Sequence, residues 1–307
     1  MKMLQIFLFG LVRITHPGRS VTTKVAAGGQ GLLAYLLLKR ERTHPRELLA
    51  GMFWGDRSQK QARRCLNTAL WRLRRVLEPE GTPRGLYLHT TPTGEVGFNQ
   101  ESNHWLDVAV FEAQIHGTLT RSISEIDSED IQKLENALEL YTDDLLEGLY
   151  DDWALRERER LRRLYLNCLA YLMRYYKHHL AFEKSLRYGH QILDKDPLRE
   201  EIHREIMHLY LEHGQRARAL QQYERCTEIL ATELGIPPMA ETQALYDQIV
   251  TRASFAPRTA AVPPDEQTIE VQSALQQLQL AQQSFEEAGQ QLRHAIQLVK
   301  QAIRPSQ

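Results

Sequence analysis

The sequence predicts a mainly α-helical protein that begins with a smaller α+β part. Three observations support this fold class. Residues 3–12 alternate between apolar and polar positions well enough to form a strand. From about residue 107 onward, apolar residues recur at helical spacing. Two of these helical stretches, which begin at Tyr176 and Tyr210, align at a spacing of 34 residues and indicate a structural repeat.

Charge is unevenly distributed along the chain. The 307 residues carry a net charge of -1, and 42% of them are hydrophobic, which is enough to build more than one core. Residues 1–100 hold 16 basic and 6 acidic residues, a net +10, whereas the remainder holds 22 basic and 33 acidic residues, a net -11. A basic domain joined to an acidic remainder is typical of a nucleic-acid-binding domain linked to a part with another role.

The chain begins with predicted strands and helices in alternation. The strand of residues 3–12 precedes a turn at Pro17 and Gly18 and a second strand near Val21–Val25. The segment GGQGLLAYLLLKRER predicts a first helix, and THPRELLAGMF predicts a second helix capped by Thr43. Two β-strands and two helices are therefore expected before the loop WGDRS.

A third helix and a hairpin complete this part. Ser58 is placed to cap the helix, and two short strands, Leu86–Thr90 and Glu95–Asn99, surround the turn TPTG. Strands, three helices and a closing hairpin predict a winged helix-turn-helix over residues 1–100. In that fold the third helix enters the major groove of DNA and the hairpin, or wing, touches the neighbouring backbone.

The third helix, KQARRCLNTALWRLRRVL, carries six basic residues and no acidic one. Its apolar residues fall on one arc: Ala62, Leu66, Ala69, Leu70, Leu73 and Leu77. Long basic side chains often only solvate a helix, but a solvated face usually mixes signs to form ion pairs. We therefore expect contacts with double-stranded DNA from Lys60, Arg63, Arg64, Asn67, Thr68, Trp71, Arg72 and Arg75, and from the wing residues His89, Thr90, Thr91 and Thr93.

Residues 107–252 are expected to form an all-α domain of tetratricopeptide-like helix pairs. The segment GQRARALQQY places its Gly, Ala and Tyr as that repeat does, whereas Leu180 stands where the first copy should have a glycine. Two such pairs seldom make a stable stack alone, so the flanking helices should complete it.

The C-terminal part predicts a linker, residues 253–265, and one long helix, residues 266–304. Apolar residues at heptad spacing favour a coiled coil that makes the protein a homodimer. The alternative is a single amphipathic helix folded back on the repeats. The expected dimerisation residues are Leu275, Leu278, Phe285, Leu292, Ile296, Val299 and Ile303.

The sequence gives little support to an enzyme. Cys65, Cys168 and Cys226 lie far apart and inside helical patterns, which favours buried thiols. His203 and His208 are five residues apart, so they miss the spacing of a zinc-binding helix. We expect no catalysis, no cofactor and no metal. Because no run of 18 apolar residues occurs, we also expect a cytoplasmic protein without a membrane partner.

Several segments resemble a known family. The N-terminal part resembles the OmpR-type winged helix, and the segments DVAVFEAQI, YTDDLLEGLYDDWALRERERL and DPLREEIHREIMHLYLEHGQRARALQQYERCTEILATELGIPP resemble the bacterial transcriptional activator domain. Together, residues 3–252 are similar to the Streptomyces antibiotic regulatory protein family. The resemblance implies a transcription activator that binds direct repeats through its winged helix and contacts RNA polymerase.

The resemblance also implies a role for the loop WGDRS, which is similar to the segment that faces polymerase. Trp54, Asp56 and Arg57 are the expected polymerase contacts. Trp54 could instead fill the core between helices, and Asp56 could cap a turn. The alternative function is a protein-interaction scaffold in which the repeats are the working part and the winged helix binds protein rather than DNA.

Overall fold

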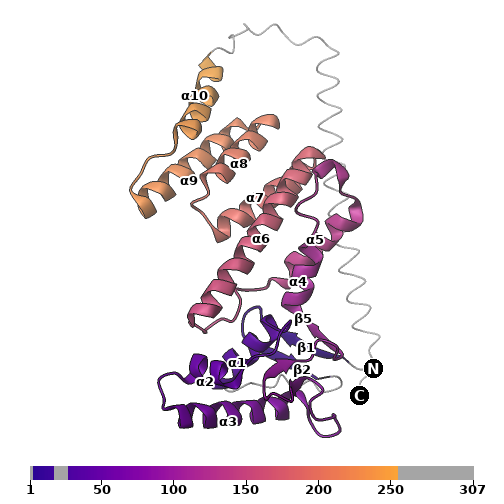
Figure 1. The fold of residues 1–307 in the computed structure, drawn as a ribbon. Coiled ribbons are helices and arrows are strands. Elements are labelled where there is room, and N and C mark those ends of the chain that lie inside the picture. Colours follow the sequence, from indigo (N-terminus) through magenta and orange to yellow (C-terminus); the bar gives the residue numbers. More distant parts are fainter. Residues whose placement is uncertain (1–2, 17–26, 255–307) are drawn as a thin grey trace, which may run out of the picture. The chain divides into compact units, whose positions relative to one another are not determined.

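The computed structural model describes residues 3–16 and 27–254. Its N-terminal part is built on a three-stranded sheet in which β1 (Leu4–Phe7) lies between β2 (Arg13–Thr15) and β5 (His104–Leu106) (Figure 1). The first pairing is antiparallel, with Ile6 opposite Ile14, and the second is parallel, with Ile6 opposite Leu106. The centre of the sheet is therefore apolar, and the side chains of these three residues are buried.

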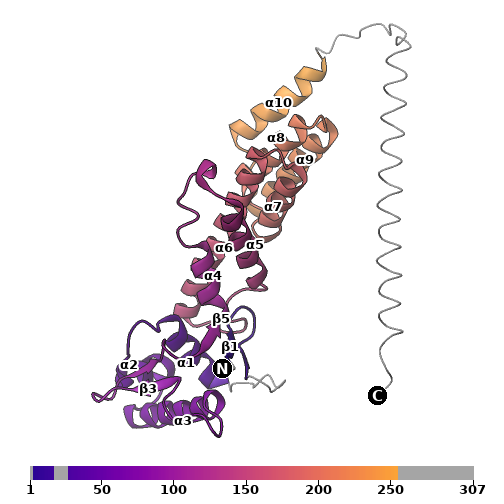
Figure 2. The ribbon, with the colours of Figure 1, turned by 90° about the vertical axis from the view of Figure 1, so that its right-hand side faces the viewer.

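Three helices and a hairpin complete this part. The elements are α1 (Ala27–Leu38), α2 (Arg46–Trp54), α3 (Gln59–Leu77), β3 (Leu88–Thr90) and β4 (Val96–Phe98). Helix α1 is apolar along its length and is buried from Leu32 to Leu37. The hairpin is fastened to the turn between α1 and α2, because His44 and Val96 exchange both backbone hydrogen bonds, at 2.8 and 2.9 Å. The winged helix-turn-helix predicted from the sequence is the fold observed (Figures 1 and 2).

Some details differ from the expectation. The strand predicted over residues 3–12 ends at Phe7, because Gly10 adopts a φ of +74° and turns the chain into β2. The second strand expected near Val21–Val25 lies outside the described residues. Pro45, not Thr43, is the N-cap of α2, and the Thr43 hydroxyl instead donates a hydrogen bond to the Glu95 carboxylate in the wing.

From residue 107 to residue 254 the described chain is helical. The elements are α4 (Asp107–Ile115), the short 3-10 helix η1 (Ile123–Glu125), α5 (Ser128–Leu140), α6 (Asp152–His178), α7 (Phe182–Lys195), α8 (Glu200–Glu212), α9 (Arg216–Leu234) and α10 (Ala240–Ser254). The predicted repeats correspond to two helix pairs, α6 with α7 and α8 with α9 (Figure 1).

The two helix pairs have equivalent turns. Leu180 and Gly214, 34 residues apart, both adopt left-handed backbone conformations, with φ of +56° and +69°. The pairs also pack closely on each other at Gly189 of α7. A Cβ atom added there would lie 3.0 Å from Cγ1 of Ile206 in α8 and 3.1 Å from Cε of Met173 in α6. A glycine at this position therefore lets three helices meet.

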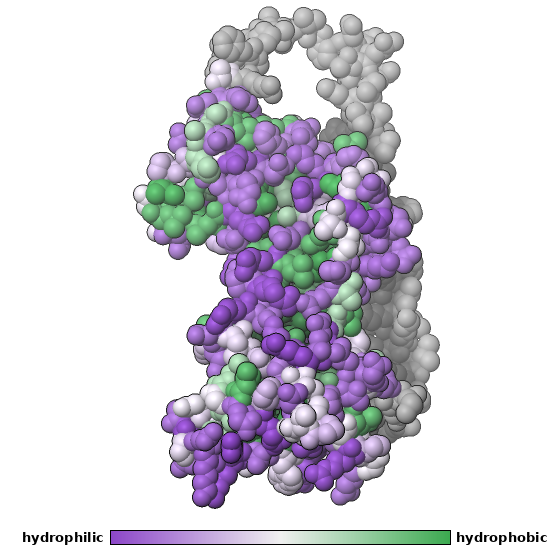
Figure 3. All heavy atoms as spheres, in the orientation of Figure 1, coloured by the Kyte–Doolittle hydropathy of each residue, from purple (hydrophilic) through white to green (hydrophobic). Residues whose placement is uncertain are grey.

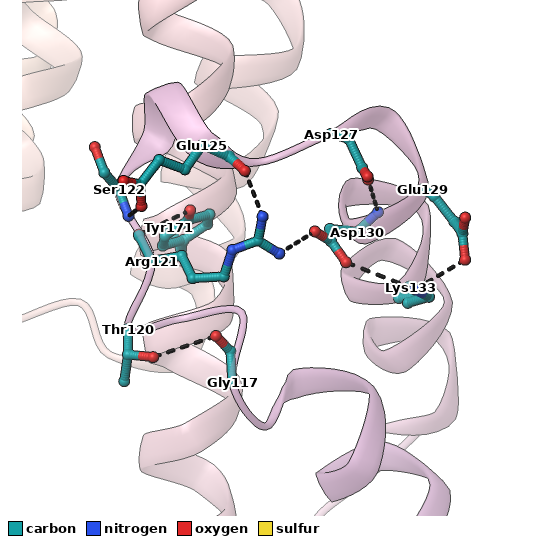
Figure 4. A network of polar contacts seen from close by, with 10 residues as sticks. All are labelled: Gly117, Thr120, Arg121, Ser122, Glu125, Asp127, Glu129, Asp130, Lys133 and Tyr171. Carbon is teal, nitrogen blue, oxygen red and sulfur yellow. Dashed lines mark hydrogen bonds and ion pairs between the residues drawn. The ribbon is translucent and has the colours of Figure 1, made fainter.

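The loop between α4 and α5 is held by a polar network centred on Arg121 (Figure 4). Its guanidinium donates to the Asp130 carboxylate and to the Glu125 carbonyl. The Tyr171 hydroxyl of α6 donates to the Arg121 carbonyl at 3.2 Å. Because α5 and α6 both hold this loop, it is a structural connection within the helical stack.

Residues Met1–Asp247 form one compact unit and Gln248–Gln307 a second one. Of the second unit, the structure describes only the end of α10. The predicted linker after residue 254, the predicted helix of residues 266–304 and all seven predicted dimerisation residues lie outside the described residues. In the part of the chain that the structure describes, no helix is both long and apolar enough to span a lipid bilayer.

Candidate nucleic-acid interface

Helix α3 is divided lengthwise into a buried and an exposed face. The six apolar residues that the sequence places on one arc, from Ala62 to Leu77, are all buried against the N-terminal core. The opposite face is exposed, and Figure 3 shows hydrophilic side chains over this part of the surface. The exposed positions include all eight predicted DNA contacts of the helix: Lys60, Arg63, Arg64, Asn67, Thr68, Trp71, Arg72 and Arg75.

The first turn of α2 reaches the middle of this exposed face. The Arg46 guanidinium donates a hydrogen bond to the Asn67 amide oxygen at 2.5 Å, and the Glu47 carboxylate lies 3.3 Å from the Arg63 guanidinium. The contacts expected from the sequence lay on α3, the wing and the turn before α3, so they included neither of these α2 residues. Because Arg63 and Glu47 are both more than half exposed, their ion pair contributes little to stability and leaves Arg63 available.

Two further α3 side chains have partners within the helix. The Thr68 hydroxyl donates to the Arg64 carbonyl at 3.0 Å, so its proton is used locally and its oxygen can only accept. The Arg75 guanidinium lies over the Trp71 ring, 5.0 Å from its centroid, and Trp71 remains 56% exposed. Trp71 and Arg75 therefore form a flat, cationic surface on the outer face.

Arg74 connects α3 to the wing. Its guanidinium donates to the Leu88 carbonyl at 3.5 Å and to the Thr90 hydroxyl at 3.0 Å. Arg74 was not among the DNA contacts expected from the sequence, since nothing in its helical position reveals a contact with a strand 14 residues later. The contact means that helix and wing share one surface.

The four predicted wing residues are not equivalent. Thr90 and Thr93 are exposed. The Thr91 hydroxyl accepts a hydrogen bond from the Glu95 amide at 3.0 Å and so closes the turn. His89 faces inward: its ring packs on Gly97, where an added Cβ would lie 2.8 Å from the histidine Cε1. The structure therefore exposes Thr90 and Thr93, whereas Thr91 and His89 are half-buried and contact other residues of the wing.

The turn between α2 and α3 carries the residues expected to contact polymerase. Asp56 and Arg57 are exposed, and the Arg57 guanidinium lies 3.2 Å from the Cys65 sulfur of α3. Trp54 is half-buried, and its ring lies 6.0 Å from that of Phe53. A cavity of about 300 Å³ opens here and is lined by Glu47, Ala50, Gly51, Trp54, Gly55, Arg57, Gln59, Ala62 and Arg63.

The remaining chemistry-bearing residues have structural partners. His203 is buried, and its ring nitrogens lie 2.7 Å from the Gln222 amide nitrogen and 3.0 Å from the Pro197 carbonyl. Burial lowers the pKa of His203, which favours the neutral ring. Cys168 and Cys226 are buried free thiols, whereas Cys65 is half-buried. Within the described residues, no group of three or more His, Cys, Asp or Glu side chains is arranged to hold a metal ion.

The chain resembles known regulators in sequence. The family model of the bacterial transcriptional activator domain matches residues 106–250. Regulatory protein AfsR of Streptomyces coelicolor is 26% identical over 250 residues, which are 80% of this chain and 24% of AfsR. Transcriptional regulatory protein MoaR1 of Mycobacterium tuberculosis is 27% identical over 231 residues, 72% of this chain and 71% of MoaR1. These matches confirm the resemblance predicted from the sequence.

The fold is also that of a solved structure. Mycobacterium tuberculosis EmbR, determined in complex with a low-affinity phosphopeptide, matches with a TM-score of 0.63 and 20% identity, over 82% of this chain and 66% of the EmbR chain. This similarity confirms the predicted fold class. The chain spans about a quarter of AfsR and about two thirds of EmbR, so both relatives contain further parts.

Proposed function

Because residues 106–250 belong to the bacterial transcriptional activator domain family, we propose that the chain is a transcriptional regulator that binds double-stranded DNA sequence-specifically through α3. The exposed face of α3 carries this proposal. Five of its eight exposed candidate residues are basic, and the helix contains no carboxylate. Such a surface matches the charge of the DNA backbone, and a helix of this width fits the major groove.

The side chains of α3 and the wing make different kinds of contact with DNA in this proposal. Lys60, Arg63 and Arg72 provide phosphate contacts, whereas Arg64 and Asn67 reach base edges from the middle of the exposed face. The wing adds backbone contacts through Thr90 and Thr93, which are exposed beside α3. Because Arg74 joins the wing to α3, both elements meet the duplex as one surface.

A gel-shift titration tests DNA binding. The full chain should bind a selected duplex with an affinity that falls with salt, because each neutralised phosphate contributes about -0.9 to the slope of log affinity against log salt. Arg64→Ala should cost about 1 to 3 kcal/mol and relax the preference at one base position. A flat salt response, or no duplex binding, would favour a protein-interaction scaffold.

We assign activation to the turn between α2 and α3. Asp56 and Arg57 are exposed there, and Arg57 lines the cavity beside Trp54, so both are accessible to RNA polymerase while α3 lies in the groove. Replacing both residues with alanine should leave DNA affinity unchanged and lower transcription in a reconstituted assay. Equal loss of both activities would show that the turn is structural.

The tail provides dimerisation in this proposal, and no cofactor is required. Two DNA-binding domains joined through residues 266–304 would raise each other's local concentration at a double site in cytoplasmic DNA. Light scattering should give a dimer for the full chain and a monomer for a chain ending at Arg252. A full-length monomer at micromolar concentration would contradict the coiled coil and favour a tail folded back on the repeats.

A further inference from the structure

The contact between Arg46 and Asn67 constrains what Asn67 can recognise. Arg46 Nη2 lies 2.5 Å from Asn67 Oδ1. A guanidinium has five N–H donors and no acceptor, so the Asn67 atom that faces it must be the amide oxygen. The amide nitrogen, with its two hydrogens, is then the group that Asn67 can offer to another molecule.

Arg46 is held in place by its neighbours along the chain. Pro45, the N-cap of α2, fixes the backbone before it with a φ of -57°. His44 is joined to Val96 by two backbone hydrogen bonds. On the other side, the Glu47 carboxylate pairs with Arg63, one helical turn before Asn67. The pairing of His44 with Val96, rather than this exposed ion pair, anchors the start of α2, and Arg46 reaches Asn67 from that point.

Asn67 lies on the exposed face of α3, between Arg64 and Trp71 at helical spacing. An asparagine with both amide groups free reads adenine, because its oxygen accepts from N6 and its nitrogen donates to N7. The Arg46 guanidinium engages one lone pair of this oxygen, and its positive charge opposes the approach of a second N–H donor to the other, so the amide acts mainly as a donor. Guanine presents two acceptors in the major groove, O6 and N7, whereas the N6 amino group of adenine would be left without an acceptor.

We propose that Arg46 is a specificity-determining positioning residue that restricts Asn67 to reading guanine in the major groove. The inference rests on the proposed DNA-binding function and adds the base preference of one position. Arg46 acts through Asn67 rather than on the DNA base. Its replacement should therefore change which base is preferred, and not only how tightly DNA is bound.

Base-substituted duplexes test this assignment. A site selected by the full chain from random duplexes would be varied one base pair at a time, and affinities measured for wild type, Arg46→Ala, Asn67→Ala and the double variant. Asn67→Ala identifies the position, because it loses preference there alone. At that position wild type should prefer guanine to adenine by about 5- to 100-fold. Arg46→Ala should shift the preference toward adenine, and the double variant should match Asn67→Ala.

Arg156→Ala is the control for loss of one positive charge, because Arg156 is an exposed arginine of α6 in the helical domain. It should leave the base preference unchanged. If Arg46→Ala weakens binding to all four base pairs equally and lowers the salt slope by about 1, Arg46 is a phosphate contact and the inference is wrong. A wild-type preference for adenine would also overturn it. If wild type binds no duplex, the proposed function itself is wrong. This outcome differs from the two above, in which DNA binding is retained and only the base assignment fails.

Discussion

At the residue scale, the two faces of α3 have different neighbours: its six buried residues face one core, whereas Asn67 and Arg74 have partners in α2 and the wing. The six buried residues of α3 follow from helical periodicity alone, since one apolar arc can face only one core. The partners of Asn67 and Arg74 could not be found in this way, because they come from α2 and the wing. His89 was expected at the surface, but the absence of a side chain at Gly97 leaves space that its ring fills.

The turns of the two helix pairs lead to a first prediction. Leu180 adopts a φ of +56° and is 84% exposed, so Leu180→Gly should relieve left-handed strain with little loss of burial. We expect the free energy of unfolding to rise by no more than about 1 kcal/mol. The larger backbone entropy that glycine loses on folding offsets part of the relieved strain. Gly214→Ala, at the equivalent position with a φ of +69°, should cost about 1 kcal/mol. Urea unfolding of both variants checks the pair, and a loss of stability in Leu180→Gly would contradict the strain.

Asp107 leads to a prediction of pH dependence. Its Oδ2 accepts backbone hydrogen bonds from Leu8 and Phe9, at 2.7 and 2.9 Å, and its Oδ1 accepts one from Val108 at 2.7 Å. Burial nevertheless raises the pKa of its carboxyl group to about 6. The unfolded chain, with a pKa near 3.9, then releases this proton at lower pH than the folded chain. The stability contributed by Asp107 is present below about pH 4 and declines as the pH rises to about 6.

Comparison with Asp107→Asn isolates this effect, because asparagine does not titrate. The unfolding free energy of wild type minus that of the variant should fall by about 3 kcal/mol or less between pH 4 and pH 6.5. Denaturant titrations at several pH values measure the difference. A constant difference, or one that grows with pH, would show that the hydrogen bonds outweigh burial and that the pKa is not raised.

At the element scale, the helices were predicted well and the strands less well. The basic helix, the wing hairpin and the two repeats occupy their predicted places, because each has a local pattern of its own. The strand β5 has only three residues and pairs with β1 about 100 residues away, so no local pattern marks it. β5 and Asp107 lie beyond residue 100, the predicted end of the N-terminal domain, although β5 pairs with β1 of that domain.

A fragment that ends at residue 100 should therefore not fold cooperatively. It would lack β5, whose strand covers one edge of β1, and Phe111, whose ring lies 5.3 Å from that of Phe9. It would also lack Leu146, whose amide donates to the Leu8 carbonyl at 2.9 Å. A fragment that ends at His178 keeps these groups and the whole of α6, and should fold. Thermal unfolding followed by circular dichroism compares the two, and a sharp transition in the shorter fragment would mean that β5 is dispensable.

At the scale of the whole unit, α6 belongs to the helical repeats and also contacts the N-terminal winged helix. The Glu157 carboxylate forms ion pairs with Lys39 of the N-terminal part and with Arg160. Burial opposes the charge of Glu157, but the two cations outweigh it and lower the pKa of its carboxyl group. Arg158 donates to the carbonyls of Leu145, Leu146 and Leu149 at 2.7 to 2.9 Å and so fixes the loop before α6. The winged helix and the helical part should therefore unfold together.

Trp153, at the start of α6, should make the main apolar contribution to the contact between α6 and the N-terminal helices. Its ring packs edge-on against Tyr35 of α1, with 5.3 Å between centroids, and lies 6.1 Å from Phe53 of α2. Trp153→Ala should therefore cost about 2 to 4 kcal/mol and keep a single transition, since a large ring is lost from a packed site. Urea unfolding followed by circular dichroism measures this, with Trp71→Ala on the exposed face of α3 as the control, expected to cost less than 1 kcal/mol.

Trp153→Phe separates packing from polarity at the same position. Among the described residues, the Trp153 indole Nε1 is buried without a hydrogen-bond partner. An unsatisfied buried N–H costs about 1 to 3 kcal/mol, so its removal should offset the smaller area of phenylalanine and leave stability within about 1 kcal/mol of wild type. If Trp153→Phe lowers the free energy of unfolding as much as Trp153→Ala does, the indole Nε1 binds a water molecule that stabilises the contact between α6 and the N-terminal helices. Two transitions in either variant would show that α6 does not couple the winged helix to the repeats.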